Sequence, residues 1–230
     1  MIGIIGAMDS EVSALYELLQ DAEITELYGY RFACGRLCGR EVVLAKCGIG
    51  KVNAAVCTQT MIMKYNPEII INSGVAGSLS PKLGICDIAV GSDVIQHDVD
   101  TTAFGDPYGL VPTVEKLSFE CDENVRRAIL DAAHRLGLNA LPARIASGDQ
   151  FISDGEKKKW IVDNFDAMAC EMEGGAIAQV CYIAGVRCAI IRAISDSTDG
   201  NHAMEYEKFM QIAADNSVKV LLETLKSELF

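Results

Sequence analysis

Carboxylic acids follow several apolar segments of this 230-residue chain, at points where a buried strand would end. Glu11 comes shortly after the first apolar run, Glu171 and Glu173 follow a later one, and Asp196 follows the last. A carboxylate beside apolar strands is costly unless it is paired or has a function there. Because the chain contains only three histidines, these acids predict acid–base chemistry by carboxyl groups, without a metal.

Each acid also has an ordinary structural explanation. Glu173 suits the first turn of a helix, where its charge would complement the helix dipole. Asp196 suits a helix cap or a turn, and Glu11 suits a solvated position on a helix. Taken one at a time, these residues leave the structural and the catalytic interpretations open.

Glycine-rich turns follow the same apolar segments but match neither common nucleotide-binding motif. Residues 3–6 and 74–77 each supply only part of the G-x-G-x-x-G dinucleotide fingerprint. A phosphate-binding P-loop fails as well, because Ala45 stands at its first glycine and Val52 follows Lys51. A nicotinamide-dependent reductase, which the fold class alone would suggest, is therefore disfavoured. Tight strand-to-helix turns explain each glycine, taken alone, without any ligand.

Apolar runs alternate with segments of helical periodicity along the chain. The predicted strands are Ile2–Gly6, Arg31–Cys34, Val42–Cys47, Glu68–Asn72, Ile88–Gln96, Ile145–Ala146, Ala167–Cys170 and Arg187–Ile194. The predicted helices are Asp9–Gln20, Lys51–Tyr65, Asn124–Leu136, Glu156–Phe165, Glu173–Ala184 and Glu205–Leu229. This order predicts a single α/β domain, residues 1–230, in which helices flank a mixed, largely parallel sheet. Such sheets bind ligands at the carboxyl ends of their strands, where the acids stand.

Composition and charge exclude several classes of partner. The formal net charge of −12 argues against a nucleic-acid partner, and no apolar run reaches the ~18 residues that span a membrane. The amino terminus lacks the features of a signal peptide. The nine cysteines include no C-x-x-C pair and most lie in apolar segments, so we expect reduced, buried thiols rather than zinc ligands. These features predict a cytoplasmic protein without a membrane partner.

Five motifs in register resemble those of the 5'-methylthioadenosine/S-adenosylhomocysteine nucleosidases. They are Ile4-Ile5-Gly6-Ala7-Met8-x-x-Glu11-Val12, Gly48-Ile49-Gly50-Lys51-Val52-Asn53-Ala54-Ala55, Ser147-Gly148-Asp149-x-Phe151-Ile152, Glu171-Met172-Glu173 and Arg192-Ala193-Ile194-Ser195-Asp196. The match runs from the first strand to about Phe209. It implies the purine nucleoside phosphorylase-like fold, with a central twisted, mixed, barrel-like sheet. It also implies a small nucleoside substrate, no cofactor, and assembly as a homodimer.

The resemblance assigns roles to individual residues. Asp196 corresponds to the general acid that protonates adenine N7, and Glu11 to the residue that holds and deprotonates the attacking water. The implied substrate-binding residues are Met8, Ile49, Val75, Ala76, Gly77, Phe104, Phe151, Ile152, Met172, Glu173, Arg192, Ser195, Tyr206 and Phe209. Among them, Glu173 binds the ribose hydroxyls and Phe151 stacks on adenine. Phe104, in the long loop Asp98–Lys116, reaches the pocket of the partner subunit.

A phosphorylase and a non-catalytic nucleoside-binding protein of the same fold are the alternatives. A phosphate dianion needs arginines and hydroxyls near the glycine turns, whereas this chain offers Asn72 and Val75 there and would repel phosphate with Glu11. The presence of Glu11, Glu173 and Asp196 together argues against a binding protein. Val75 and Tyr206 depart from residues common in nucleosidases, so the 5' substituent stays open, and 5'-deoxyadenosine or aminodeoxyfutalosine are further candidates.

Overall fold

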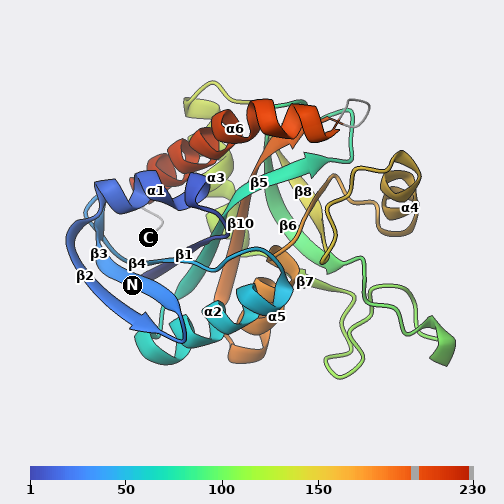
Figure 1. The fold of residues 1–230 in the computed structure, drawn as a ribbon, viewed down its shortest axis with the longest axis horizontal. Coiled ribbons are helices and arrows are strands. Elements are labelled where there is room, and N and C mark those ends of the chain that lie inside the picture. The colour runs from blue at the N-terminus through green and yellow to red at the C-terminus, as the bar shows by residue number, and fades with distance from the viewer. Residues whose placement is uncertain (198–201, 228–230) are drawn as a thin grey trace.

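Strands and helices alternate along the chain and lead into one ten-stranded sheet over the described residues (Figure 1). The structure is a computed structural model that describes residues 1–197 and 202–227, apart from the side chains of residues 202–205 and 207. The strands are β1 (Ile2–Gly6), β2 (Gln20–Leu27), β3 (Tyr30–Leu37), β4 (Arg40–Lys46), β5 (Ile69–Ser78), β6 (Ile88–Gln96), β7 (Ser118–Glu120), β8 (Ala140–Ser147), β9 (Ala169–Glu171) and β10 (Arg187–Asp196). The helices are α1 (Asp9–Leu18), α2 (Lys51–Tyr65), the 3-10 turn η1 (Thr102–Phe104), α3 (Glu123–Arg135), α4 (Gly155–Phe165), α5 (Gly174–Ala184) and α6 (His202–Leu225).

Strand β5 is the centre of the sheet. It pairs in parallel with β1 along one edge and with β10 along the other, and its last residues pair antiparallel with β9. The strand order β10-β6-β8-β9-β5, together with the β10–β5 pairing, closes these five strands into a barrel. Strands β1, β4, β3 and β2 continue the sheet outward from β5. The predicted mixed, barrel-like sheet is therefore confirmed.

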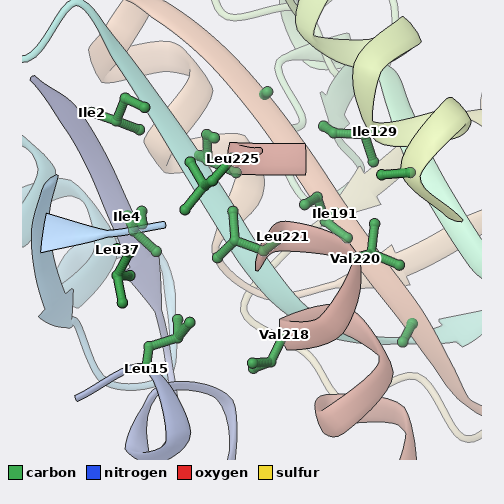
Figure 2. Close-up of a cluster of buried hydrophobic side chains, with 14 of the residues drawn as sticks. Ile2, Ile4, Leu15, Leu37, Ile129, Ile191, Val218, Val220, Leu221 and Leu225 are labelled. Atoms are coloured by element: carbon green, nitrogen blue, oxygen red, sulfur yellow. The ribbon is translucent and has the colours of Figure 1, made fainter. Parts of the chain in front are cut away.

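Helices cover both faces of this sheet because its central strands contain continuous apolar stretches, such as residues 69–71 of β5. Ile69 and Ile71 of β5 pack with α1, α3 and α6, whereas Ile70 packs with α2 and α5 on the opposite face. Figure 2 shows the first cluster, in which Leu221 and Leu225 of α6 lie against the sheet. Alternate residues of one strand thus enter two different cores, which explains the continuous apolar runs of the sequence.

Several element boundaries differ from the sequence prediction. Strand β2 was not expected, and no residue in it is buried, so it carries no apolar pattern that would reveal it. The three-residue strand β7 also escaped prediction. Strand β8 begins at Ala140 rather than Ile145, and β10 continues to Asp196, beyond the predicted Ile194. Within the described residues, no helix is long and apolar enough to cross a membrane.

Candidate active site

A cavity of about 410 Å³ opens at the carboxyl ends of β1, β5, β9 and β10. Pockets for small ligands typically measure ~300–1,000 Å³ and are mostly apolar with a few polar groups. The residues that line it are Ala7, Met8, Glu11, Ile49, Val75, Ala76, Gly77, Phe151, Cys170, Glu171, Met172, Glu173, Ser195, Asp196 and Tyr206. Its acids are all supplied by the ends of strands or by the helices that follow them, as expected of an α/β sheet.

Glu11 is held in the cavity wall by the main chain. It lies in the first turn of α1 and is buried, and its carboxylate bends back toward the end of β1. The backbone N–H groups of Ala7 and Met8 donate to Oε2 at 2.7 and 3.0 Å, and that of Val75 donates to Oε1 at 3.0 Å. Three donors from two strand ends fix both oxygens, which gives this carboxylate one orientation.

A buried arginine lies beneath the cavity, where it binds one of the cavity's carboxylates and lies close to another. The Arg192 guanidinium donates to Glu171 Oε2 and to Asn72 Oδ1, and it lies 3.9 Å from Glu173 Oε2. Burial alone would lower the pKa of Arg192, but the charges of Glu171, Glu173 and Glu11 outweigh it and raise that pKa. The arginine is therefore a fixed cation, and its charge is already shared among acids of this chain.

Glu173 carries the surplus negative charge of this cluster. Burial, and then the neighbouring Glu171, raise the pKa of Glu173 to about 7 against the pull of Arg192. The backbone N–H of Gly50 donates to Glu173 Oε1 at 2.9 Å and ties the acid to the turn after β4. The Glu173 carboxyl group thus changes charge near neutral pH while it faces the cavity.

Asp196 occupies the end of β10 and also lines the cavity. The pairing of β10 with β5 shifts register between Ile194 and Asp196, so that Asp196, rather than Ser195, pairs with Gly77. Asp196 is 2% exposed, and Ser195 Oγ donates to its Oδ1 at 3.0 Å. The Lys158 ammonium group of α4 lies 3.4 Å from Oδ2, so the setting is not purely apolar.

Two glycines of β5 make room for these acids. A Cβ at Gly74 would lie 2.4 Å from both Glu11 Oε1 and Arg192 Nη1, and one at Gly77 would lie 2.9 Å from Asp196 Oδ2. Glu11 is anchored on Val75 and Asp196 pairs with Gly77. Their contact points on β5 are therefore two residues, or roughly 7 Å, apart along the strand.

An aromatic pair closes the outer side of the cavity. The rings of Phe151 and Tyr206 meet edge to face with their centroids 5.5 Å apart, and the Tyr206 hydroxyl donates to the Met8 sulfur at 3.3 Å. Cys170 also lines the cavity, but burial raises the pKa of its thiol to about 12 and leaves it a poor nucleophile. Among the described residues, no group of three His, Cys, Asp or Glu side chains is arranged to hold a metal ion.

Comparison with known proteins agrees with this geometry. A family model described as the phosphorylase superfamily matches residues 1–226. A 5'-methylthioadenosine/S-adenosylhomocysteine nucleosidase of Shewanella halifaxensis is 39% identical over 227 residues, which are 98% of each chain. The crystal structure of such a nucleosidase from Neisseria meningitidis, in complex with methylthio-immucillin-A, aligns with a TM-score of 0.94, 36% identity and 98% coverage of both chains.

The chain belongs to the 5'-methylthioadenosine/S-adenosylhomocysteine nucleosidase family. The family resemblance predicted from the five motifs is therefore confirmed. A futalosine hydrolase of Helicobacter pylori also aligns, with a TM-score of 0.92 and 36% identity over 97% of this chain and 96% of that one. Proteins that are named for different nucleosides thus share this fold at equal similarity to the chain.

Twelve of the sixteen predicted site residues of this nucleosidase-family chain line the cavity. They are Met8, Glu11, Ile49, Val75, Ala76, Gly77, Phe151, Met172, Glu173, Ser195, Asp196 and Tyr206. The other four lie elsewhere. Arg192 is buried beneath the cavity, Ile152 belongs to the core around α4, and Phe209 does not line the wall. Phe104 is 88% exposed on η1, outside the cavity of its own protomer.

Sequence reasoning missed two charged residues of the site. Glu171 was grouped with the other acids but was given no role of its own, although its oxygen binds Arg192 and the backbone N–H groups of Glu173 and Gly174. Lys158 stands among the three consecutive lysines 157–159 of α4, which look like a solvated helix face. Only the helical position could have revealed it, because it follows Asp154 by one turn and precedes the buried Ile161 by three residues.

Proposed function

We propose that the protein hydrolyses the N-glycosidic bond of 5'-methylthioadenosine and of S-adenosylhomocysteine, releasing adenine. The observation that carries this proposal is that two separately anchored acids, Glu11 and Asp196, both line one nucleoside-sized cavity. Glu11 is anchored on Val75 of β5, and Asp196 pairs with Gly77, two residues farther along that strand. Inverting glycosidases likewise use two separate carboxyl groups, one to protonate the leaving group and one to activate a water. Family membership at about 40% identity over the chain supports the same reaction.

Asp196 supplies the proton for the leaving group. Cleavage passes through an oxocarbenium-like state, which requires the departing purine to be neutral. Asp196 gives its proton to N7 of adenine as the bond between C1' and N9 breaks, and it becomes a carboxylate. The Ser195 hydroxyl donates to its other oxygen and holds the acid in line with the base. Phe151 stacks on the purine ring from the mouth of the cavity.

Glu11 supplies the nucleophile. A water on the opposite face of the sugar gives its proton to the Glu11 carboxylate as its oxygen bonds to C1'. The three backbone donors to Glu11 keep its two oxygens in place during this transfer. Glu173 accepts hydrogen bonds from the ribose hydroxyls, and Met172 packs on the sugar. The 5' substituent lies toward Met8, Ile49 and Tyr206.

The cavity favours water over phosphate as the nucleophile. Arg192, whose guanidinium lies with the Glu11 carboxylate beside Gly74, already donates to Glu171 and Asn72. Glu11, Glu171 and Glu173 give the cavity a negative surplus on the sugar side, which disfavours a dianion. These residues support the hydrolase over the phosphorylase.

Adenine release from 5'-methylthioadenosine, with phosphate first excluded and then added, tests the proposal. We expect release without phosphate, together with free 5-methylthioribose. Asp196→Asn should lower kcat by about 10²–10⁴-fold while the protein still binds substrate, because one general acid contributes that much. Release only with phosphate, or wild-type turnover by Asp196→Asn, contradicts the mechanism. No release from either nucleoside points to the binding protein, and release from aminodeoxyfutalosine alone moves the substrate toward that of the futalosine hydrolase.

The proposal extends to assembly as a homodimer. Large apolar side chains are exposed along α2 and near it, namely Tyr28, Val52, Val56, Met63 and Ile183. A second cavity beside α2 is lined partly by the same residues. Such a surface is typical of a protein interface. Two copies joined there would bury it, and the exposed Phe104 of each would complete the pocket of the other.

The proposal also places the enzyme in the cytoplasm as one nucleosidase domain spanning residues 1–230. All nine cysteines are free thiols, six of them buried, which suits a reducing compartment. The continuous sheet from β2 to β10 supports one folding unit over the described residues.

A further inference from the structure

Lys158 of α4 reaches the catalytic end of β10 from outside the barrel. It is 5% exposed, and α4 lies beyond the carboxyl end of β5 (Figure 1). Its ammonium group lies 2.9 Å from the Ser197 carbonyl oxygen, 3.3 Å from that of Ser78 and 3.4 Å from Asp196 Oδ2. One cation therefore joins the end of β5, the end of β10 and the carboxyl group assigned as the acid.

We propose that Lys158 is a positioning residue for Asp196, which also stabilises the carboxylate left behind when the Asp196 proton passes to the purine. This inference rests on the proposed function of Asp196. The charge balance gives the reason. Before the transfer Asp196 is neutral, and after it the negative charge lies 3.4 Å from the ammonium group. The attraction is thus strongest once the proton has moved, and an interaction that strengthens along the reaction raises kcat.

Among the described groups beside Asp196, Lys158 brings a positive charge to the carboxyl group. Ser195 contributes a neutral hydroxyl from β10, Gly77 and Ser78 of β5 contribute backbone, and Tyr206 of α6 contributes a phenol whose pKa is raised by burial. Cys170 of β9 is a neutral thiol, and the nearby Glu171 is held by Arg192. The Lys158 contact to Asp196 Oδ2, at 3.4 Å, is longer than its contact to the Ser197 carbonyl oxygen, at 2.9 Å.

Two outcomes distinguish this role from a structural one. If Lys158 only holds α4 in place, its replacement should lower stability and kcat by the same factor whether residue 196 is aspartate or asparagine. A lysine that acts through Asp196 matters only while Asp196 can give its proton. Double-mutant cycles separate the two cases, because residues that act as a unit are not additive.

The experiment measures kcat and KM for 5'-methylthioadenosine in wild type, Lys158→Met, Lys158→Arg and Asp196→Asn, and in the double variant Lys158→Met/Asp196→Asn. We expect Lys158→Met to lower kcat by roughly 10²-fold with KM changed less than about threefold. Arginine keeps the charge and should recover most of kcat. In the Asp196→Asn background, Lys158→Met should cost less than about threefold.

The control is Lys159→Met on the same helix, whose ammonium group is exposed and paired with Asp163. It should leave kcat unchanged. If Lys158→Met does not fold, Lys158→Gln replaces it, since its amide can still donate to the Ser197 carbonyl but carries no charge. The inference is overturned if the neutral variant retains kcat within about threefold of wild type, or if its loss is equal in both backgrounds. If the wild-type protein releases no adenine, that result contradicts the proposed function instead of the role of Lys158.

Discussion

The charge of Glu173 makes a measurable prediction about stability. Burial and the neighbouring Glu171 raise the pKa of this carboxyl from 4.5 to about 7 in the folded protein. In the unfolded chain the proton is lost near pH 4.5, so between pH 4.5 and 7 the folded state binds the extra proton. The free energy of unfolding therefore falls as pH rises through this window. The stability that the protonated Glu173 contributes is fully lost above pH 7. The difference between a pKa of 4.5 and one of about 7 corresponds to about 3 kcal/mol in the free energy of unfolding.

Glu173→Gln removes this penalty because glutamine resembles the protonated acid in shape and carries no charge. Its oxygen can still accept from the Gly50 N–H. At pH 8 the variant should be more stable than wild type by up to about 3 kcal/mol, or roughly 6–12 °C in Tm for a chain of this size. At pH 5 the two should agree within about 1 kcal/mol.

Thermal and urea unfolding at pH 5 and pH 8 provide the assay, with the exposed Glu17→Gln on α1 as the control for loss of a charge. An equal pH dependence of unfolding in wild type and Glu173→Gln would refute the reasoning. The same variant should have a higher KM, because a neutral amide accepts ribose hydroxyls more weakly than a carboxylate. A protein that gains stability and loses substrate affinity at one position is the expected signature of a binding acid.

Two further changes test the geometry of the walls and of the assembly. Gly74→Ala adds a methyl group 2.4 Å from Glu11 and Arg192, and it should destabilise the fold by about 1–3 kcal/mol and lower kcat. The control Gly84→Ala meets only Asp87 at 3.6 Å and should change neither the urea midpoint nor kcat. Phe104→Ala should raise KM by about tenfold through loss of an apolar contact, while Tm is unchanged because the ring is exposed in its own protomer. An unchanged KM would contradict the proposal that Phe104 contributes to the pocket of the partner subunit.

Sequence patterns alone predicted most strands of the sheet, for a physical reason, whereas most individual residues of the cavity wall came from the family resemblance. A continuous apolar run, such as residues 69–71, predicts a strand that is buried on both faces. Acids that follow parallel strands of this kind are expected at the same edge of the sheet. Strand β2 lacked this signal because its side chains face solvent. Lys158 lacked it because a lysine on a helix is most often solvated, and only the packing of α4 on the ends of β5 and β10 distinguishes it from Lys159.

The N–H of Val75, rather than its side chain, holds Glu11. Any residue other than proline offers that N–H, so position 75 can change in evolution without displacing the base. Its side chain still faces the cavity and can reshape the wall that meets the ligand. Selection can therefore alter ligand preference at this position while the reaction chemistry is preserved. This separation gives a physical reason why enzymes of one fold can diverge among nucleosides, and it recommends position 75 as a first site for redesign of ligand preference.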